Sequence, residues 1–209
     1  MIAQQLFILP VEKTMLINNF IKKFFKKKSK KNIFILSGGK SIKKIYKKIY
    51  NLDISWANSK IFIVDERLIK QEKNLNSTLI KKIFKTKCDI YDVFENKVKN
   101  SYITKKIKKN NTLAILGMGE DGHFASIFNN SKKYKSLINP KETPGIYTTE
   151  KIGKPFCKRV TMNLSMINLS LKIILVVANK KRLEILKRFI KFPDKKIPII
   201  HLLKNKKKN

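Results

Sequence analysis

The chain has 209 residues, with 48 Lys or Arg against 14 Asp or Glu and a formal net charge of +34. An apolar fraction of 43% in a chain of this length supports a substantial core and excludes disorder throughout. There is no apolar run of about eighteen residues, and the first residues lack a basic segment and a cleavage site. We therefore expect neither a membrane helix nor a secretory signal. The two cysteines, Cys88 and Cys157, exclude a disulfide scaffold and predict a reducing, cytoplasmic location.

The excess of lysine has two explanations. Lys, Ile and Asn, whose codons are rich in A and T, are abundant, while Arg, Ala, Pro and Gly are scarce. A genome drifting toward A and T would give this composition, but a protein that binds nucleic-acid phosphates would also be strongly basic. The lysines are spread from Lys13 to Lys208, and the aromatic residues are mostly Phe within apolar runs. This distribution favours drift and predicts no specific nucleic-acid partner.

The predicted elements alternate between amphipathic helices and short apolar strands. In chain order they are a helix at 11–31, a strand at 32–37, a helix at 41–50, strands at 61–64, 112–116 and 172–177, and a helix at 180–191. Such alternation is typical of a parallel sheet covered by helices on both faces. We therefore predict an α/β fold with three layers, α/β/α, around a mostly parallel sheet.

The domain organisation is predicted to be simple, because the chain contains neither an internal repeat nor a Pro-, Ser- or Gly-rich linker. Residues 129–157 hold several Pro and Gly and predict a long irregular excursion rather than a domain boundary. We predict one domain over residues 1–209, in which residues 204–209 form a frayed basic tail.

Glycine is scarce, yet five of the seven glycines lie in two short loops. The first loop, Ser37-Gly38-Gly39-Lys40-Ser41, falls between a predicted strand and a predicted helix. Backbone amides, hydroxyls and the positive end of a helix suit a phosphate, although a Gly pair also makes any tight turn from strand to helix. The spacing is that of neither a Walker loop nor a dinucleotide-binding loop.

The second loop runs from Gly117 to His123 and carries three glycines. Asp121 and His123 stand two residues apart at an expected helix start, where His123 could transfer protons near neutral pH and Asp121 could orient it. In the alternative interpretation, Asp121 caps the helix and His123 packs nearby. Because Gly and His are so scarce here, catalysis is the favoured interpretation.

Three further features are less specific. The segment Asp65-Glu66-Arg67 follows the strand at 61–64. It is interpreted either as part of a site or as a solvated loop with an internal ion pair. His201 lies in an apolar run and is interpreted as structural. Two histidines without a ligand-spaced cluster predict no metal site.

Taken in order, these loops resemble the family of 6-phosphogluconolactonases and glucosamine-6-phosphate deaminases. The matching stretches are LSGGKSIKKIY (36–46), IVDERLI (63–69), NLNS (74–77), LAILGMGEDGHFASIF (113–128), RVTMNLSMIN (159–168) and VVANKKRLEIL (176–186). The resemblance implies a Rossmann-like sheet and hydrolysis of 6-phosphogluconolactone, a phosphorylated sugar lactone, in the pentose phosphate pathway. It implies no metal and no coenzyme, and we expect a monomer or a small homo-oligomer.

The resemblance also implies catalytic roles for individual residues. His123 would activate the attacking water, and Asp121 would hold His123 or contact the sugar. Arg67 would bind the substrate or help to polarise it, while Asp65 would support the loop that carries Arg67.

For the substrate phosphate, the resemblance implies a seat on the loop from Ser37 to Ser41. Arg159 and Lys181 would neutralise its charge, with Lys180 as an alternative to Lys181. Lys40 replaces a hydroxyl residue of the family pattern, and it would either bind the phosphate or point to solvent.

Two alternative functions are open. Glucosamine-6-phosphate deaminases resemble this chain, but they carry a carboxylate after the Asp-Gly-His motif, where this chain has Ser126-Ile127-Phe128. That difference favours the lactonase. A basic nucleic-acid-binding protein on a decayed enzyme scaffold is the second alternative, and the intact loop from Gly117 to His123 argues against decay.

Overall fold

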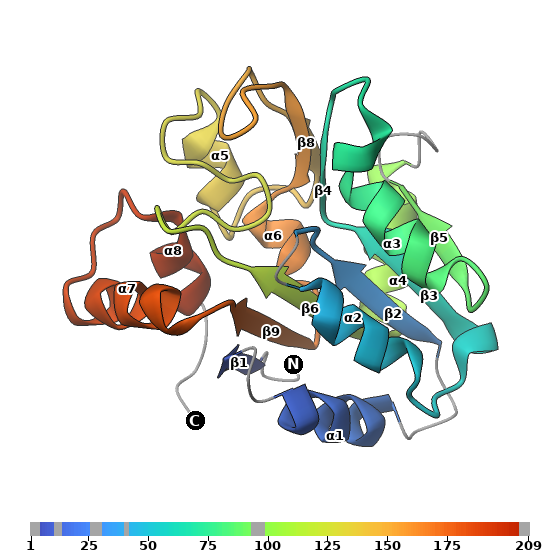
Figure 1. Ribbon diagram of the computed structural model, residues 1–209. Helices are drawn as coiled ribbons and strands as arrows, with labels where there is room; N and C mark the ends of the chain where they lie inside the picture. The colour runs from blue at the N-terminus through green and yellow to red at the C-terminus, as the bar shows by residue number, and fades with distance from the viewer. Residues whose placement is uncertain (1–4, 11–13, 26–30, 40–41, 93–98, 205–209) are drawn as a thin grey trace.

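The computed structural model describes residues 5–10, 14–25, 31–39, 42–92 and 99–204 (Figure 1). Its centre is a six-stranded sheet in the order β1-β9-β6-β2-β3-β5, with every neighbouring pair parallel. The strands are β1 (Gln5–Pro10), β2 (Asn32–Leu36), β3 (Ser59–Ile63), β5 (Asp89–Tyr91), β6 (Asn111–Gly117) and β9 (Lys172–Val177). The α/β fold and the parallel sheet are thus confirmed.

Successive residues of the central strands alternate between two apolar clusters, one on each face of the sheet. In β2, Phe34 and Leu36 belong to one cluster, while Ile33 and Ile35 belong to the other. Both faces are covered by helices, so a strand that is apolar at every position stabilises both layers. This explains why the central strands were visible in the sequence as continuous apolar runs.

The helices divide between the two faces (Figure 1). One cluster includes buried side chains of α1 (Thr14–Phe25), α2 (Lys43–Tyr50) and α3 (Asn76–Phe84). The other includes side chains of α4 (Asn100–Lys109), α5 (Tyr134–Ile138), α6 (Leu164–Ile167), α7 (Lys180–Lys191) and α8 (Pro198–Lys204). Two short 3-10 helices, η2 (Trp56–Asn58) and η3 (Glu72–Asn74), precede β3 and α3.

A second, antiparallel sheet stands beside the carboxyl ends of the large one (Figure 1). It has the order β4-β8-β7, with β4 (Asp65–Arg67), β7 (Ile146–Thr148) and β8 (Arg159–Met162). Val64 alone separates β3 from β4, so the chain passes directly from the large sheet into the small one. The small sheet therefore lies where ligands gather in parallel α/β folds.

Most predicted elements are confirmed, and the errors fall in the small sheet and in the loops around the cavity. Strands form at 32–36, 59–63, 111–117 and 172–177, and helices at 43–50 and 180–191. Of the helix predicted at 11–31, residues 14–25 are helical, while 11–13 and 26–30 lie outside the described residues. The region 129–157, predicted to be irregular, contains α5 and β7, and Asp65–Arg67 form a strand. The tail beyond Lys204 lies outside the described residues, and the single domain stays a prediction. Among the described helices, none is long and apolar enough to span a bilayer.

Candidate active site

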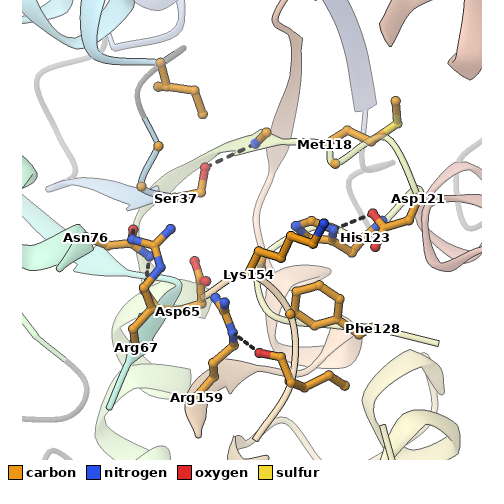
Figure 2. Close-up of a pocket in the computed structure, with 18 of the residues that line it drawn as sticks. Ser37, Asp65, Arg67, Asn76, Met118, Asp121, His123, Phe128, Lys154 and Arg159 are labelled. Carbon is orange, nitrogen blue, oxygen red and sulfur yellow. Dashed lines mark hydrogen bonds and ion pairs between the residues drawn. The ribbon is translucent and has the colours of Figure 1, made fainter. Parts of the chain in front are cut away.

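A cavity of about 780 Å³ opens at the carboxyl ends of the large sheet. Its wall is built by the loops after β2 and β6, by the small sheet and by residues 152–156. Figure 2 shows His123 and Asp121 on one side of it, Ser37 and Arg67 on the other, and Asp65 between them. The structure thus brings together most of the predicted site residues.

The first glycine loop forms one wall of the cavity. The Ser37 Oγ accepts a hydrogen bond from the Gly117 N–H at 3.1 Å, which ties the loop after β2 to the end of β6. Gly39 has a φ of +114°, a conformation that favours glycine. A Cβ on Gly38 would lie 1.8 Å from the Asn76 Oδ1, so the loop passes directly over α3. Lys40 and Ser41 fall outside the described residues.

The second glycine loop is a tight turn, so the helix start expected at Asp121 and His123 is wrong. No helix is present between β6 and α5, and the Gly119 N–H donates to the His123 carbonyl at 2.8 Å. A Cβ on Gly119 would lie 2.2 Å from the imidazole of His123. Glycine is required at position 119 because the backbone there passes against the histidine ring. This contact, and not a helix start, accounts for the glycine.

His123 and Asp121 form a pair within this turn. The His123 Nδ1 and the Asp121 Oδ1 are 2.5 Å apart. Partial burial opposes ionisation of Asp121, but the hydrogen bond and positive charge of His123 outweigh it and lower the Asp121 pKa. With Nδ1 occupied by a carboxylate, Nε2 is the ring nitrogen available for proton transfer.

An aromatic ring supports the imidazole. The rings of His123 and Phe128 are stacked, with their centroids 4.2 Å apart. Phe128 also lies under the Arg159 guanidinium, whose carbon is 5.3 Å from the ring centroid. In the sequence, Phe128 served only to distinguish the lactonase pattern from the deaminase pattern, so this supporting role was missed.

Asp65 lies on β4 and is buried at the bottom of the cavity, with 5% of its surface exposed. The Ser126 Oγ donates to its Oδ2 at 2.6 Å. Burial raises the pKa of Asp65, while the Ser126 hydrogen bond and the charges of Arg67, Arg159 and His123 oppose that rise. Asp65 is therefore a buried carboxylate on which the charges of Arg67, Arg159 and His123 all act.

Glu66 and Asn76 connect the cavity to α3. The Glu66 carboxylate accepts backbone N–H groups of Arg67, Asn76 and Ser77 at 2.7–2.9 Å, although burial raises its pKa. Asn76 donates to the Asp65 carbonyl, and its Oδ1 accepts from the Arg67 Nη1 at 3.2 Å. Arg67 is thus held by Asn76 and by the Asn74 carbonyl, which it meets at 2.6 Å. The internal ion pair considered for residues 65–67 is replaced by these contacts.

The two residues predicted to neutralise the phosphate lie in different surroundings. Arg159 is only 4% exposed, and it donates to the carbonyls of Ile152 and Pro155 at 3.0 Å each. It lines the cavity and also fixes the loop at 152–155. Lys181 is exposed and pairs with Glu120 at 2.7 Å, and it is not among the residues that line the cavity.

Two cationic residues of the cavity wall were not predicted from the sequence. Lys154 projects from the loop that Arg159 fixes, in the region predicted to be irregular (Figure 2). Arg182 lines the cavity from the first turn of α7. The scarcity of arginine was the available signal for Arg182. Within the described residues, no group of three or more His, Cys, Asp or Glu is placed to hold a metal ion.

The fold and the cavity define an α/β protein with its candidate site at the carboxyl ends of a parallel sheet. Residues 13–209 match the family described as glucosamine-6-phosphate isomerases/6-phosphogluconolactonase, and the chain belongs to that family.

Individual relatives agree with this assignment. A probable 6-phosphogluconolactonase of Dictyostelium discoideum is 35% identical over 157 residues, which cover 63% of this chain and 62% of that protein. The crystal structure of 6-phosphogluconolactonase from Thermotoga maritima has a TM-score of 0.73 at 22% identity, covering 95% of this chain and 94% of that chain. A monomeric glucosamine-6-phosphate deaminase has a TM-score of 0.70 at 15% identity, covering 95% of this chain and 92% of that chain. The structural likenesses show a fold shared by both activities.

Proposed function

We propose that this protein hydrolyses the ester of 6-phosphogluconolactone to give 6-phosphogluconate, a step of the pentose phosphate pathway. The pairing of His123 with Asp121 in the wall of a cavity rich in cationic side chains carries this proposal. The names of the relatives support it, since the curated relatives include 6-phosphogluconolactonases.

The reaction needs one base and no redox chemistry. The His123 Nε2 accepts a proton from a water molecule as the water oxygen bonds to the lactone carbonyl carbon. The carbonyl electrons move to oxygen, and the tetrahedral intermediate then collapses. The bond from the carbon to the ring oxygen breaks, and the ring oxygen takes the proton back from His123. The products are a carboxylic acid, which ionises, and a hydroxyl group.

Charge stabilisation comes from the other side chains in the cavity. Asp121 stabilises the imidazolium that forms while the proton resides on His123. Arg67 binds the substrate or polarises its carbonyl, and Asp65 supports the strand on which Arg67 lies. The loop from Ser37 to Ser41 receives the phosphate, because backbone amides beside a helix start suit an anion.

The rival activity within the family is deamination of glucosamine 6-phosphate. The deaminase pattern has a carboxylate where this chain has the apolar stretch that ends at Phe128, and Phe128 packs against His123. Ser126 donates to Asp65 instead of supplying a second acid. These contacts favour the lactonase, and a cytoplasmic monomer or small homo-oligomer stays our prediction.

The test follows hydrolysis of freshly generated 6-phosphogluconolactone against its spontaneous opening. We expect the wild-type protein to accelerate hydrolysis and the His123→Asn variant to lose that acceleration while it keeps its circular dichroism spectrum. A folded wild-type protein that leaves the spontaneous rate unchanged would overturn the proposal. The same preparation is then assayed with glucosamine 6-phosphate, where ammonia release would identify a deaminase.

A further inference from the structure

Two adjacent basic residues in the first turn of α7 face different surroundings. The Lys181 Nζ bonds to the Glu120 Oε2 at 2.7 Å, and its side chain is 69% exposed. Arg182 is partly buried and lines the cavity together with Val176 and Ala178 at the end of β9. Lys181 and Arg182 are thus adjacent on the helix, yet the first forms a surface ion pair and the second is a cationic group in the cavity wall.

The Arg182 guanidinium keeps donors for a ligand in the cavity. Its Nε is enclosed and makes no hydrogen bond within the part of the chain that the structure describes, so a ligand does not reach it. Its backbone N–H is already used, since it donates to the Asn179 Oδ1 at 2.9 Å and so fixes the start of the helix. The Nη groups are therefore the donors that Arg182, as a residue of the cavity wall, offers to an anion.

The sheet order places Arg182 opposite the first glycine loop. Strands β9, β6 and β2 are neighbours in the sheet, so the end of β9 and the loop after β2 flank the end of β6. The cavity is lined there by Ser37, Gly38 and Gly39 on one side and by Arg182 on the other. Backbone amides on one side of this space and a guanidinium on the other can both donate hydrogen bonds to the oxygens of a phosphate group.

The remaining charges favour the same location. Arg67 and Arg159 already donate to backbone carbonyls, although the Arg67 Nε is unpartnered like that of Arg182, and their charges oppose the rise that burial causes in the Asp65 pKa. The carboxylate of Glu120 would compete with a phosphate for Arg182, but Lys181 bonds to it. That hydrogen bond is the main cause of the lowered Glu120 pKa, to which the charge of Arg182 also contributes. Lys181 is thus already paired with Glu120, the acidic residue near Arg182.

We infer that Arg182, and not its neighbour Lys181, binds the phosphate of the substrate together with the loop at Ser37–Gly39. This inference rests on the proposed function for the identity of the ligand. A guanidinium offers two parallel donors to phosphate oxygens, whereas an ammonium offers a point charge. Arg182 is therefore a specificity residue that separates phosphorylated from unphosphorylated sugar acids.

The test compares Arg182→Gln with Lys181→Gln by calorimetric titration with 6-phosphogluconate and with gluconate. The two variants lose the same charge one residue apart, so their long-range electrostatic fields change almost equally. Loss of a charged hydrogen-bonding pair corresponds to roughly tenfold or more in affinity. We expect that loss for 6-phosphogluconate in Arg182→Gln, a change within about twofold in Lys181→Gln, and equal gluconate binding in both variants.

A loss in Lys181→Gln that equals or exceeds the loss in Arg182→Gln would overturn the inference, as would unchanged binding in Arg182→Gln. Thermal melting of both variants checks that each is folded. Arg182→Lys provides a second variant, which keeps the charge and removes the fork. We expect it to bind 6-phosphogluconate more weakly than the wild type, and wild-type affinity would overturn the assignment of a bidentate contact.

The titration needs no turnover, so the two proposals fail separately. A wild-type protein that binds 6-phosphogluconate through Arg182 but hydrolyses no lactone would overturn the lactonase function and leave this inference standing. Hydrolysis that depends on Lys181 and not on Arg182 would overturn this inference and leave the lactonase function standing. In steady-state assays we expect Arg182→Gln to raise KM far more than it lowers kcat, because phosphate binding is shared by the ground and transition states.

Discussion

The two sheets of this protein contribute to the site in different ways. The strands of the large sheet place Gly117 and Val176 in the cavity wall, and neither of these carries a functional group. The small sheet places Asp65, Arg67 and Arg159 there from within its own strands. The large sheet therefore acts as a scaffold whose loops carry the site, whereas the strands of the small sheet themselves carry charged side chains of the site.

This difference predicts separate consequences for mutations in the two regions. Removing a functional side chain from a loop after a large-sheet strand should alter the chemistry and leave stability nearly unchanged, whereas adding bulk at a closely packed glycine of such a loop should destabilise the protein. Changes in the small sheet should affect both, because the same side chains bind other parts of the chain. Four predictions test this distinction, in order of decreasing expected effect.

The largest effect is expected for His123→Asn, in the loop after β6. Removal of a general base costs on the order of 10²–10⁴-fold in turnover, whereas the melting temperature should change little because His123 is partly exposed. Initial rates and thermal melts of the same preparation measure both quantities. A rate within a few-fold of the wild type would remove His123 from the proposed mechanism.

Arg159→Met should act mainly on stability. The variant leaves the carbonyls of Ile152 and Pro155 without their buried donor, and we expect a loss of about 2–4 kcal/mol in the free energy of unfolding. Urea denaturation measures it, and Lys158→Met, at an exposed neighbouring position, is the matched control. Equal stability of the two variants would show that the loop at 152–155 does not depend on Arg159.

Gly38→Ala tests the contact between the first glycine loop and α3. The added Cβ would overlap the Asn76 side chain, so we expect a loss of about 1–3 kcal/mol in stability, as for other overpacked sites. The change should be smaller in an Asn76→Ala background, where the two nearest atoms, Oδ1 and Cγ, are absent. A double-mutant cycle by urea denaturation measures this coupling, and additive effects would contradict it.

The smallest effect is a change of pH dependence in Asp121→Asn. The pKa of Asp121 is lowered in the folded protein, so its ionised form contributes stability that is present near neutrality and is lost as the pH falls through that pKa. We therefore expect the melting temperature of Asp121→Asn to fall less on acidification than that of the wild type, as thermal melts over a series of pH values would measure. An identical pH dependence in the two proteins would contradict the contact between Asp121 and His123.

The contrast between the sheets also explains what the sequence could predict. The central strands are buried on both faces, so their apolar runs revealed them, and the glycines after β2 and β6 marked two loops of the cavity. Strand β4 is only three residues long and consists of Asp65, Glu66 and Arg67, so no apolar pattern could reveal it. Its partner strand is β8, whose Arg159 pairs with Arg67 from a position 92 residues further along the chain (159 − 67), and only the folded chain brings the two together.

The side-chain assignments show the same limit. The sequence predicted Asp121 and His123 through their spacing, but for the phosphate it weighed Lys181 and Lys180 and did not consider Arg182. Which side chain reaches the cavity depends on which side of α7 faces it: Arg182 lines the cavity, whereas Lys181 pairs with Glu120 at the surface. Likewise, the turn at Gly119 depends on contact with a ring, which helix propensity does not describe.

Phe128 lies between His123 and Arg159, and its position joins two functions of the molecule. Arg159 fixes the loop that carries Gly153, where a Cβ would lie 2.7 Å from the Phe128 ring, and the same ring stacks against the imidazole of His123. Local unfolding of residues 152–156 would remove one wall of the cavity and the support of the base in the same event. The site should therefore open as a cooperative unit, and heat should abolish binding and turnover together rather than in separate stages.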